Sequence, residues 1–158
     1  MARFGNVHRI TLSVGGREIT FRSKLEYRYC VYLQLLKEQG LIQDWWYEDP
    51  DSLLELVQQY ENNIKRYLPD FTVLTNEGHY EYHETKGWFP AKDYTKLKLT
   101  SEQYENEIVL IFANLNNTRS QRAQYNRAKR LEDGKFVKRV IWNAKRDIFR
   151  KIKHLFEV

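Results

Sequence analysis

The sequence predicts one mixed α/β domain, with a central β-sheet flanked by helices and with basic helices at its C-terminal end. Its 158 residues are 42% hydrophobic and 15% aromatic, with 3 Pro and 7 Gly, which suits a single folded domain and excludes disordered and low-complexity chains. Three patterns predict the class: a strand pair of alternating polarity over 9–21, an apolar helical repeat over 24–39 and a continuous apolar run over 108–113. Strands and helices that follow one another in this way favour a mixed sheet covered by helices.

The first 40 residues predict a β-hairpin followed by a helix. Two segments of alternating polarity, 9–14 and 17–21, flank a glycine pair, and such a pair permits the positive φ angles of a two-residue turn. Ser23 and Glu26 then match a capping box, in which each side chain bonds the backbone N–H of the other residue. Apolar residues recur at helical spacing after this box, so we expect a helix over 24–39.

The middle of the chain predicts strands joined by short turns. Aromatic and β-branched residues predict strands over 42–48 and 53–60, the second of which is also compatible with a short helix. A hairpin is then expected with arms over 64–75 and 79–87, because a polar turn containing glycine separates them. A helix over 92–104 precedes the apolar run, which is typical of a fully buried strand.

Charge is unevenly distributed along the chain. The 26 basic and 21 acidic residues give a net charge of +5, yet residues 1–118 hold 13 basic and 17 acidic residues (net −4), and residues 119–158 hold 13 basic and 4 acidic (net +9). The basic segment 119–158 favours binding to a polyanion, most often nucleic acid, and the alternative is an ordinary solvated helical surface. Helices are predicted throughout this segment from one apolar stripe: Val137, Ile141, Ile148, Ile152 and Leu155.

The sequence predicts a cytoplasmic protein that does not enter a membrane. The N-terminal residues lack the apolar run of a signal peptide, and the longest apolar stretches are too short to span a bilayer. Cys30 is the single cysteine, so no disulfide can form within the chain, which favours a reducing compartment.

Two carboxylates and an ammonium group are expected to meet on the predicted hairpin. Glu84 and Lys86 are two residues apart in a strand and therefore share a face, and Asp70 opens the preceding strand, where antiparallel pairing can place it beside Glu84. Neighbouring carboxylates repel one another, and a hard divalent cation such as Mg²⁺ supplies the missing positive charge. Lys86 could then orient or activate a water molecule or stabilise developing negative charge. The alternative is a set of surface charges with Lys86 in a cross-strand ion pair.

Three motifs containing these residues resemble those of the PD-(D/E)XK nuclease superfamily. The motifs are Phe-Arg-Ser-Lys-Leu-Glu-Tyr at 21–27, Arg-Tyr-Leu-Pro-Asp-Phe at 66–71 and Tyr-His-Glu-Thr-Lys-Gly-Trp at 82–88. The resemblance covers residues 21–104 and is strongest to small phage-encoded endonucleases and Holliday junction resolvases. It implies a restriction-endonuclease-like sheet. The charge asymmetry and the helical pattern after Thr118 divide this single nuclease domain into a catalytic core over 1–118 and a basic helical extension over 119–158.

The resemblance also implies roles for individual residues. Glu26, Asp70, Glu84 and Lys86 correspond to the catalytic positions of the superfamily. The metal ligands implied are Asp70, Glu84, Glu26 and the backbone carbonyl of Thr85, with Mg²⁺ as the cofactor and Mn²⁺ as a substitute. The alternative for Glu26 is a purely structural role as the capping-box partner of Ser23.

The function implied is that of a Mg²⁺-dependent, structure-selective DNA endonuclease, with a Holliday junction resolvase that cuts four-way junctions or other branched DNA as the favoured interpretation. Because resolution of a junction needs paired cuts on opposing strands, a twofold homodimer is expected; for a phage-encoded protein, the compartment would be the host cytoplasm. The residues expected to contact DNA are Lys96, Lys98, Arg119, Arg122, Lys145 and Arg146. The alternatives are a nickase or a restriction-type or repair nuclease of the same superfamily, and a non-catalytic module that binds nucleic acid.

Overall fold

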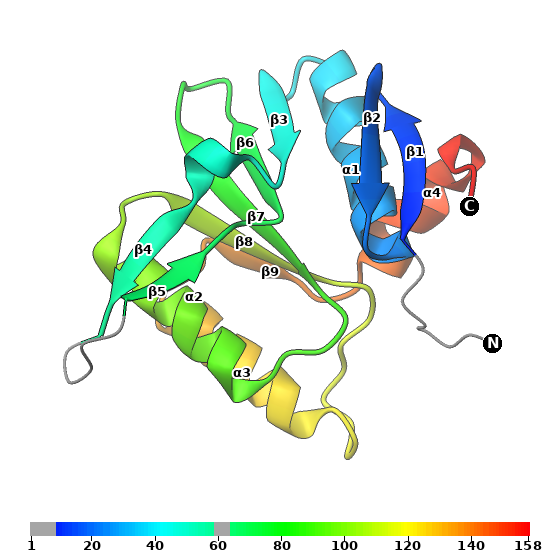
Figure 1. The fold of residues 1–158 in the computed structure, drawn as a ribbon. Coiled ribbons are helices and arrows are strands. Elements are labelled where there is room, and N and C mark those ends of the chain that lie inside the picture. Colours follow the sequence, from blue (N-terminus) through cyan, green and yellow to red (C-terminus); the bar gives the residue numbers. More distant parts are fainter. Residues whose placement is uncertain (1–8, 59–63) are drawn as a thin grey trace.

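A five-stranded mixed sheet forms the centre of the computed structural model, which describes residues 9–58 and 64–158 (Figure 1). In spatial order its strands are β3 (Asp44–Tyr47), β6 (Phe71–Leu74), β7 (Tyr80–Lys86), β8 (Glu107–Phe112) and β9 (Arg139–Ile141). Strand β6 is antiparallel to both of its neighbours, β3 and β7, whereas β7, β8 and β9 run parallel to one another. The predicted mixed α/β class is therefore confirmed, and the apolar run over 108–113 is the strand β8 at the interior of the sheet.

Two hairpins lie outside the central sheet. Strands β1 (Ile10–Val14) and β2 (Arg17–Phe21) pair as predicted around Gly15 and Gly16, whose φ angles are +59° and +78°. Strands β4 (Leu54–Val57) and β5 (Ile64–Tyr67) form the second hairpin. The end of the strand predicted over 53–60 lies outside the described residues, as do residues 1–8, on which the signal-peptide prediction depends.

The prediction of a single strand over 64–75 is wrong, because this stretch forms two strands in two different sheets. Strand β5 ends at Tyr67 and β6 begins at Phe71. Pro69 lies between them, and proline cannot donate a backbone hydrogen bond to a sheet. After this break, Asp70 immediately precedes β6.

The helices cover both faces of the sheet. Helices α2 (Ala91–Gln103) and α3 (Arg122–Asp133) lie side by side on one face, whereas α1 (Lys24–Glu38) and α4 (Arg150–Ile152) lie on the other (Figure 1). A separate apolar core fills each interface. Of the helices in the two described ranges, none combines the length and the hydropathy needed to cross a membrane.

The apolar stripe predicts helices throughout the C-terminal segment, and this prediction is wrong because the segment also contains a strand. Val137 precedes β9 and Ile141 lies within it, so these two residues are not on a helix. Strand β9 pairs with β8, with Val140 opposite Leu110. A strand of three residues is too short to show an alternating pattern, and β-branched residues in a parallel strand look like an apolar helical face. After β9 the chain does become helical, with a π-helical turn (Lys145–Phe149), α4 and a 3₁₀ turn (Lys153–Leu155).

Candidate active site

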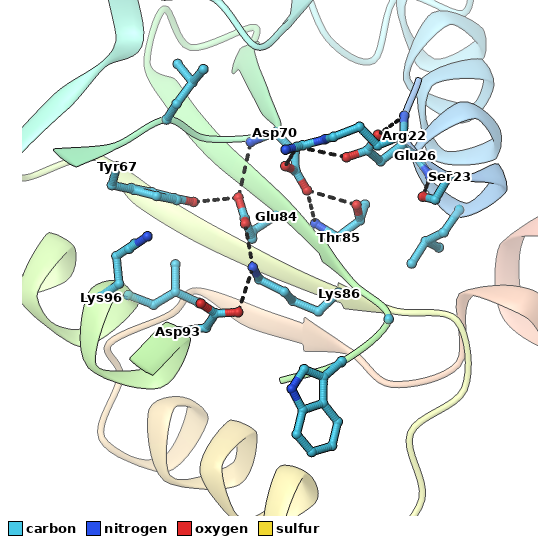
Figure 2. A pocket seen from close by; sticks show the side chains of 15 residues that line it. Arg22, Ser23, Glu26, Tyr67, Asp70, Glu84, Thr85, Lys86, Asp93 and Lys96 are labelled. Atoms are coloured by element: carbon cyan, nitrogen blue, oxygen red, sulfur yellow. Dashed lines mark hydrogen bonds and ion pairs between the residues drawn. The ribbon is translucent and has the colours of Figure 1, made fainter. Parts of the chain in front are cut away.

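A cavity of about 400 Å³ opens where the N-terminal end of α1, the end of β7 and the first turns of α2 meet (Figure 2). The structure brings all the residues of the predicted metal and catalytic site to this cavity: Glu26, Asp70, Glu84, Thr85 and Lys86. They come from α1, the residue before β6 and the end of β7, which are separated in sequence and adjacent in space.

Pairing of β6 with β7 places Asp70 beside Glu84. Phe71 lies opposite His83 in this antiparallel pair, so the next residues along the two strands are neighbours. The N–H of Asp70 donates to Oε1 of Glu84 at 3.1 Å. The N–H and the hydroxyl of Thr85 both donate to Oδ2 of Asp70 at 2.9 Å. These bonds fix the position of the Asp70 carboxylate on the sheet.

The two carboxylates are buried close to each other. Asp70 is 4% exposed and Glu84 is 5% exposed, which contradicts the alternative that they are surface charges of a hairpin. Burial raises the pKa of Asp70 well above its ordinary value, and the negative charges of Glu84 and Glu26 raise it further, although the bonds from Thr85 act in the opposite direction. Burial and the two neighbouring carboxylates therefore make the ionised form of Asp70 unfavourable.

Lys86 lies between two carboxylates. Its Nζ is 3.0 Å from Oε2 of Glu84 and 3.0 Å from Oδ2 of Asp93 in the first turn of α2. Burial lowers the pKa of Lys86, but the two carboxylates outweigh burial and raise it above the ordinary lysine value. Lys86 is therefore an ammonium ion at neutral pH. Asp93 is missed by sequence reasoning, because an acid in the first turn of a helix is usually explained by the helix dipole.

The backbone of Glu26 takes part in capping α1, whereas its carboxylate has other partners. The Ser23 hydroxyl accepts a bond from the N–H of Glu26 at 3.1 Å, which caps α1 as predicted. The Glu26 carboxylate does not complete the predicted reciprocal box, because its Oε1 accepts from the N–H of Arg22 and from the Tyr47 hydroxyl, each at 2.8 Å. The carboxylate consequently lines the cavity rather than the helix end alone.

Arg22 is a further cation of the site that the sequence does not single out. Its guanidinium lies beside the carboxylates of Glu26, Asp70 and Glu48, a residue just after β3 (Figure 2 shows the first two contacts). Glu48 has a φ of +46°, which is unusual for a residue other than glycine, and its N–H donates to the carbonyl of Asp70 at 2.9 Å. Burial lowers the pKa of Arg22, but these carboxylates raise it above its ordinary value.

Tyr67 supports Glu84 from the second hairpin. Its hydroxyl donates to Oε1 of Glu84 at 2.8 Å. Burial raises the pKa of Tyr67 well above its ordinary value, and the charge of Glu84 adds to this effect, so the phenol stays protonated. Tyr67 belongs to the motif around Asp70, but neither spacing nor residue type indicates which carboxylate it bonds.

The oxygen donors of the cavity have the chemistry of a site for a hard divalent cation. Carboxylate oxygens of Asp70 and Glu84 are the ligand type that Mg²⁺ prefers, and a bound cation would favour the ionised form of Asp70. As the side chains stand, no group of three or more His, Cys, Asp or Glu residues within 9–58 and 64–158 is arranged to hold a metal ion. The guanidinium of Arg22 lies between Asp70 and Glu26, so these two carboxylates face an organic cation.

The residues predicted to contact DNA are mostly outside the cavity. Lys96 lines it, on the same helix as Asp93 (Figure 2). Lys98 is turned away, with its Nζ 5.3 Å from the centre of the Phe136 ring. The remaining four, which are exposed and do not line the cavity, are Arg119, Arg122, Lys145 and Arg146. Trp88, 63% exposed, is an aromatic residue at the cavity.

The cavity thus joins buried carboxylates, whose oxygens are of the type that can bind a hard metal ion, to the cations of Arg22, Lys86 and Lys96, which are of the type that can bind a phosphate. Comparisons of the chain with protein-family models, with curated proteins and with solved structures find no significant match.

Proposed function

We propose that this chain is a divalent-metal-dependent DNA endonuclease that hydrolyses phosphodiester bonds in branched DNA. One observation carries the proposal: Asp70 and Glu84, two buried carboxylates, converge with the ammonium of Lys86 in one open cavity. Buried like charges destabilise a fold, so this arrangement is better explained by chemistry than by stability. The motif resemblance to PD-(D/E)XK nucleases supports the same conclusion.

Mg²⁺ fits the donor set, with Mn²⁺ as a substitute. Asp70 and Glu84 would hold the ion, together with Glu26 and the carbonyl of Thr85 that the resemblance assigns. When bound, the ion would lower the pKa of a coordinated water and balance the negative charge of the phosphate.

The chain's own residues orient these groups. Thr85 fixes the carboxylate of Asp70 through two hydrogen bonds, and Tyr67 fixes that of Glu84. Lys86, held by Glu84 and Asp93, presents a positive charge to the cavity. This ammonium can orient the attacking water or stabilise negative charge on the phosphoryl oxygens, because it lies among fixed partners and needs little rearrangement.

The preference for branched DNA depends mainly on the resemblance to junction resolvases. The exposed basic residues Arg119, Arg122, Lys145 and Arg146 would contact the DNA backbone, whose phosphates attract cations irrespective of sequence. Two active sites are needed to cut opposing strands of a junction, so we propose that the protein acts as a homodimer.

The proposal is tested by cleavage of labelled four-way junction, linear duplex and single-stranded DNA in Mg²⁺, Mn²⁺ and EDTA. We expect paired, symmetric nicks in the junction with either metal and none in EDTA. Glu84→Gln should reduce the rate by about a thousandfold, whereas Glu102→Gln, an exposed change on α2, should not. Equal cutting of all three substrates would support the nuclease activity but contradict the preference for junctions. DNA binding without metal-dependent cutting would indicate a non-catalytic binding module.

Two lysines of α2 provide a prediction about DNA contact. Lys96 lines the cavity, whereas Lys98 covers the ring of Phe136. Lys96→Gln should therefore weaken binding of junction DNA by about fivefold, the effect of about 1 kcal/mol for one charge pair in water, and reduce the salt dependence by about one ion. Lys98→Gln is the matched control and should change affinity less than twofold, by about 0.4 kcal/mol at most. Fluorescence anisotropy at several salt concentrations measures both, and equal effects would contradict the assignment.

A further inference from the structure

Arg22 places one nitrogen atom among three carboxylates. Its Nη2 lies close to one oxygen of each: 3.1 Å from Glu26, 2.8 Å from Glu48 and 3.1 Å from Asp70. One NH₂ group carries two hydrogens, so it cannot direct a full hydrogen bond to three oxygens at once. The oxygens are thus arranged around a point of positive charge, which differs from the planar, bidentate pairing that arginine usually makes with a carboxylate.

The guanidinium and the two inner carboxylates differ in their freedom to move. The side chains of Glu26 and Asp70 are 7% and 6% exposed and are held by Tyr47 and Thr85. The side chain of Arg22 is 46% exposed. Arg22 can therefore move towards solvent without opening the core, while the carboxylates remain in place. Glu48, at 32% exposed, is the outermost of its three partners.

We propose that Arg22 is an exchangeable counter-ion of the site. In the metal-free protein its guanidinium holds the carboxylates of Glu26 and Asp70 together against their repulsion, and it yields this place when a divalent cation binds. The inference rests on the proposed function, because it concerns the same metal, and it adds a positioning residue to the site. Glu48 lies where it can keep the displaced guanidinium near the cavity, since its N–H is bonded to the carbonyl of Asp70.

Arg22→Gln tests this exchange without measuring catalysis. We expect the variant to bind Mn²⁺ at least about fivefold more tightly than the parent, because a competing cation has been removed. Loss of free Mn²⁺ signal in electron paramagnetic resonance gives this affinity. In EDTA the variant should unfold at a lower temperature than the parent, and this difference should shrink in saturating Mg²⁺, because the metal then supplies the missing charge.

Arg66→Gln is the matched control. It also removes one arginine charge, but Arg66 is an exposed residue whose partner Glu55 lies 3.9 Å away. The control should bind Mn²⁺ as the parent does and show no Mg²⁺-dependent change in its melting temperature relative to the parent.

The outcomes separate this inference from the proposed function. The exchange would be overturned if Arg22→Gln bound Mn²⁺ no more tightly than the parent. It would also be overturned if the lower melting temperature of the variant persisted unchanged in Mg²⁺. Either result would identify an ordinary structural ion pair. A variant that folds only in Mg²⁺ would support it, and one unfolded in both buffers would overturn it. If the parent cleaves DNA while the variant fails these tests, only the role of Arg22 is lost. A parent that neither binds Mn²⁺ nor cleaves DNA would overturn both proposals.

Discussion

Replacing Asp70 with asparagine is expected to reduce metal-dependent DNA cleavage by about a thousandfold while raising the thermal stability of the metal-free protein. The change would remove a charged ligand of the proposed metal ion. A metal-ion contact supplies several kcal/mol of charge stabilisation, of which about 4 kcal/mol equals a thousandfold in rate. The amide oxygen of asparagine can still accept the bonds that Thr85 donates. The carboxylate charge, by contrast, is unfavourable in the folded state, because burial and the charges of Glu84 and Glu26 raise its pKa.

The expected gain in stability depends on pH in a defined direction. The pKa of Asp70 is higher in the folded protein than its ordinary value of 3.8, so the folded state loses stability as pH rises and this carboxyl ionises. The gain from Asp70→Asn should be largest at pH 7 to 8 and should decrease towards pH 4, where the acid is increasingly protonated in both states. Each kcal/mol would raise the melting temperature by about 2 to 4 °C in a chain of this size.

Asp44→Asn is a control for which the expected change in stability has the opposite sign. Burial raises the pKa of Asp44, but hydrogen bonds from Trp45, Lys37 and Arg17 outweigh this and lower it. Its charge therefore stabilises the fold above pH 4, so the asparagine variant should lose stability at pH 7 and lose less near pH 4. Thermal unfolding of both variants in EDTA, followed by circular dichroism, measures the contrast. An Asp70→Asn protein that is less stable than the parent at pH 7.5 would contradict the account of the site.

The core of the candidate site could be predicted from sequence because it depends on local rules. Alternation along one strand places Glu84 and Lys86 on one face, and a hairpin brings Asp70 to them. Alternation also predicts that Trp45 and Trp46 point in opposite directions; Trp45 is fully buried, and Trp46 contacts the ring of Tyr80.

Other parts of the site depend on contacts that local rules do not define. Arg22 is four residues from Glu26, but its guanidinium reaches Asp70 and Glu48 only because β2, β3 and β6 converge there. Asp93 meets Lys86 because the chain turns at the end of β7. Strand β9 was missed for a related reason, since its three residues become a strand through pairing with β8 rather than through their own pattern.

Lys86→Met is expected to reduce cleavage by about a thousandfold, because it removes a preorganised positive charge from the reacting phosphate. Methionine keeps most of the length of the side chain but cannot pair with Glu84 or Asp93. Junction binding in EDTA should stay within about fivefold of the parent, the effect of about 1 kcal/mol for one charge. Lys98→Met, on the far side of α2, is the matched control and should cleave at the parental rate. A Lys86→Met protein that cleaves within about tenfold of the parent would remove Lys86 from the mechanism.

The pH dependence of cleavage distinguishes the two roles open to Lys86. Burial lowers its pKa, but Glu84 and Asp93 raise it above the ordinary value of 10.5, so the side chain is protonated between pH 7 and 9. An ammonium that orients water or stabilises charge would then contribute equally across this range, and the ratio of parental to Lys86→Met rates should stay constant. A neutral amine acting as general base would instead gain population by about tenfold per pH unit, and the ratio would rise accordingly. Single-turnover rates at pH 7, 8 and 9 decide between them, and the two carboxylates 3.0 Å from Nζ favour the constant ratio.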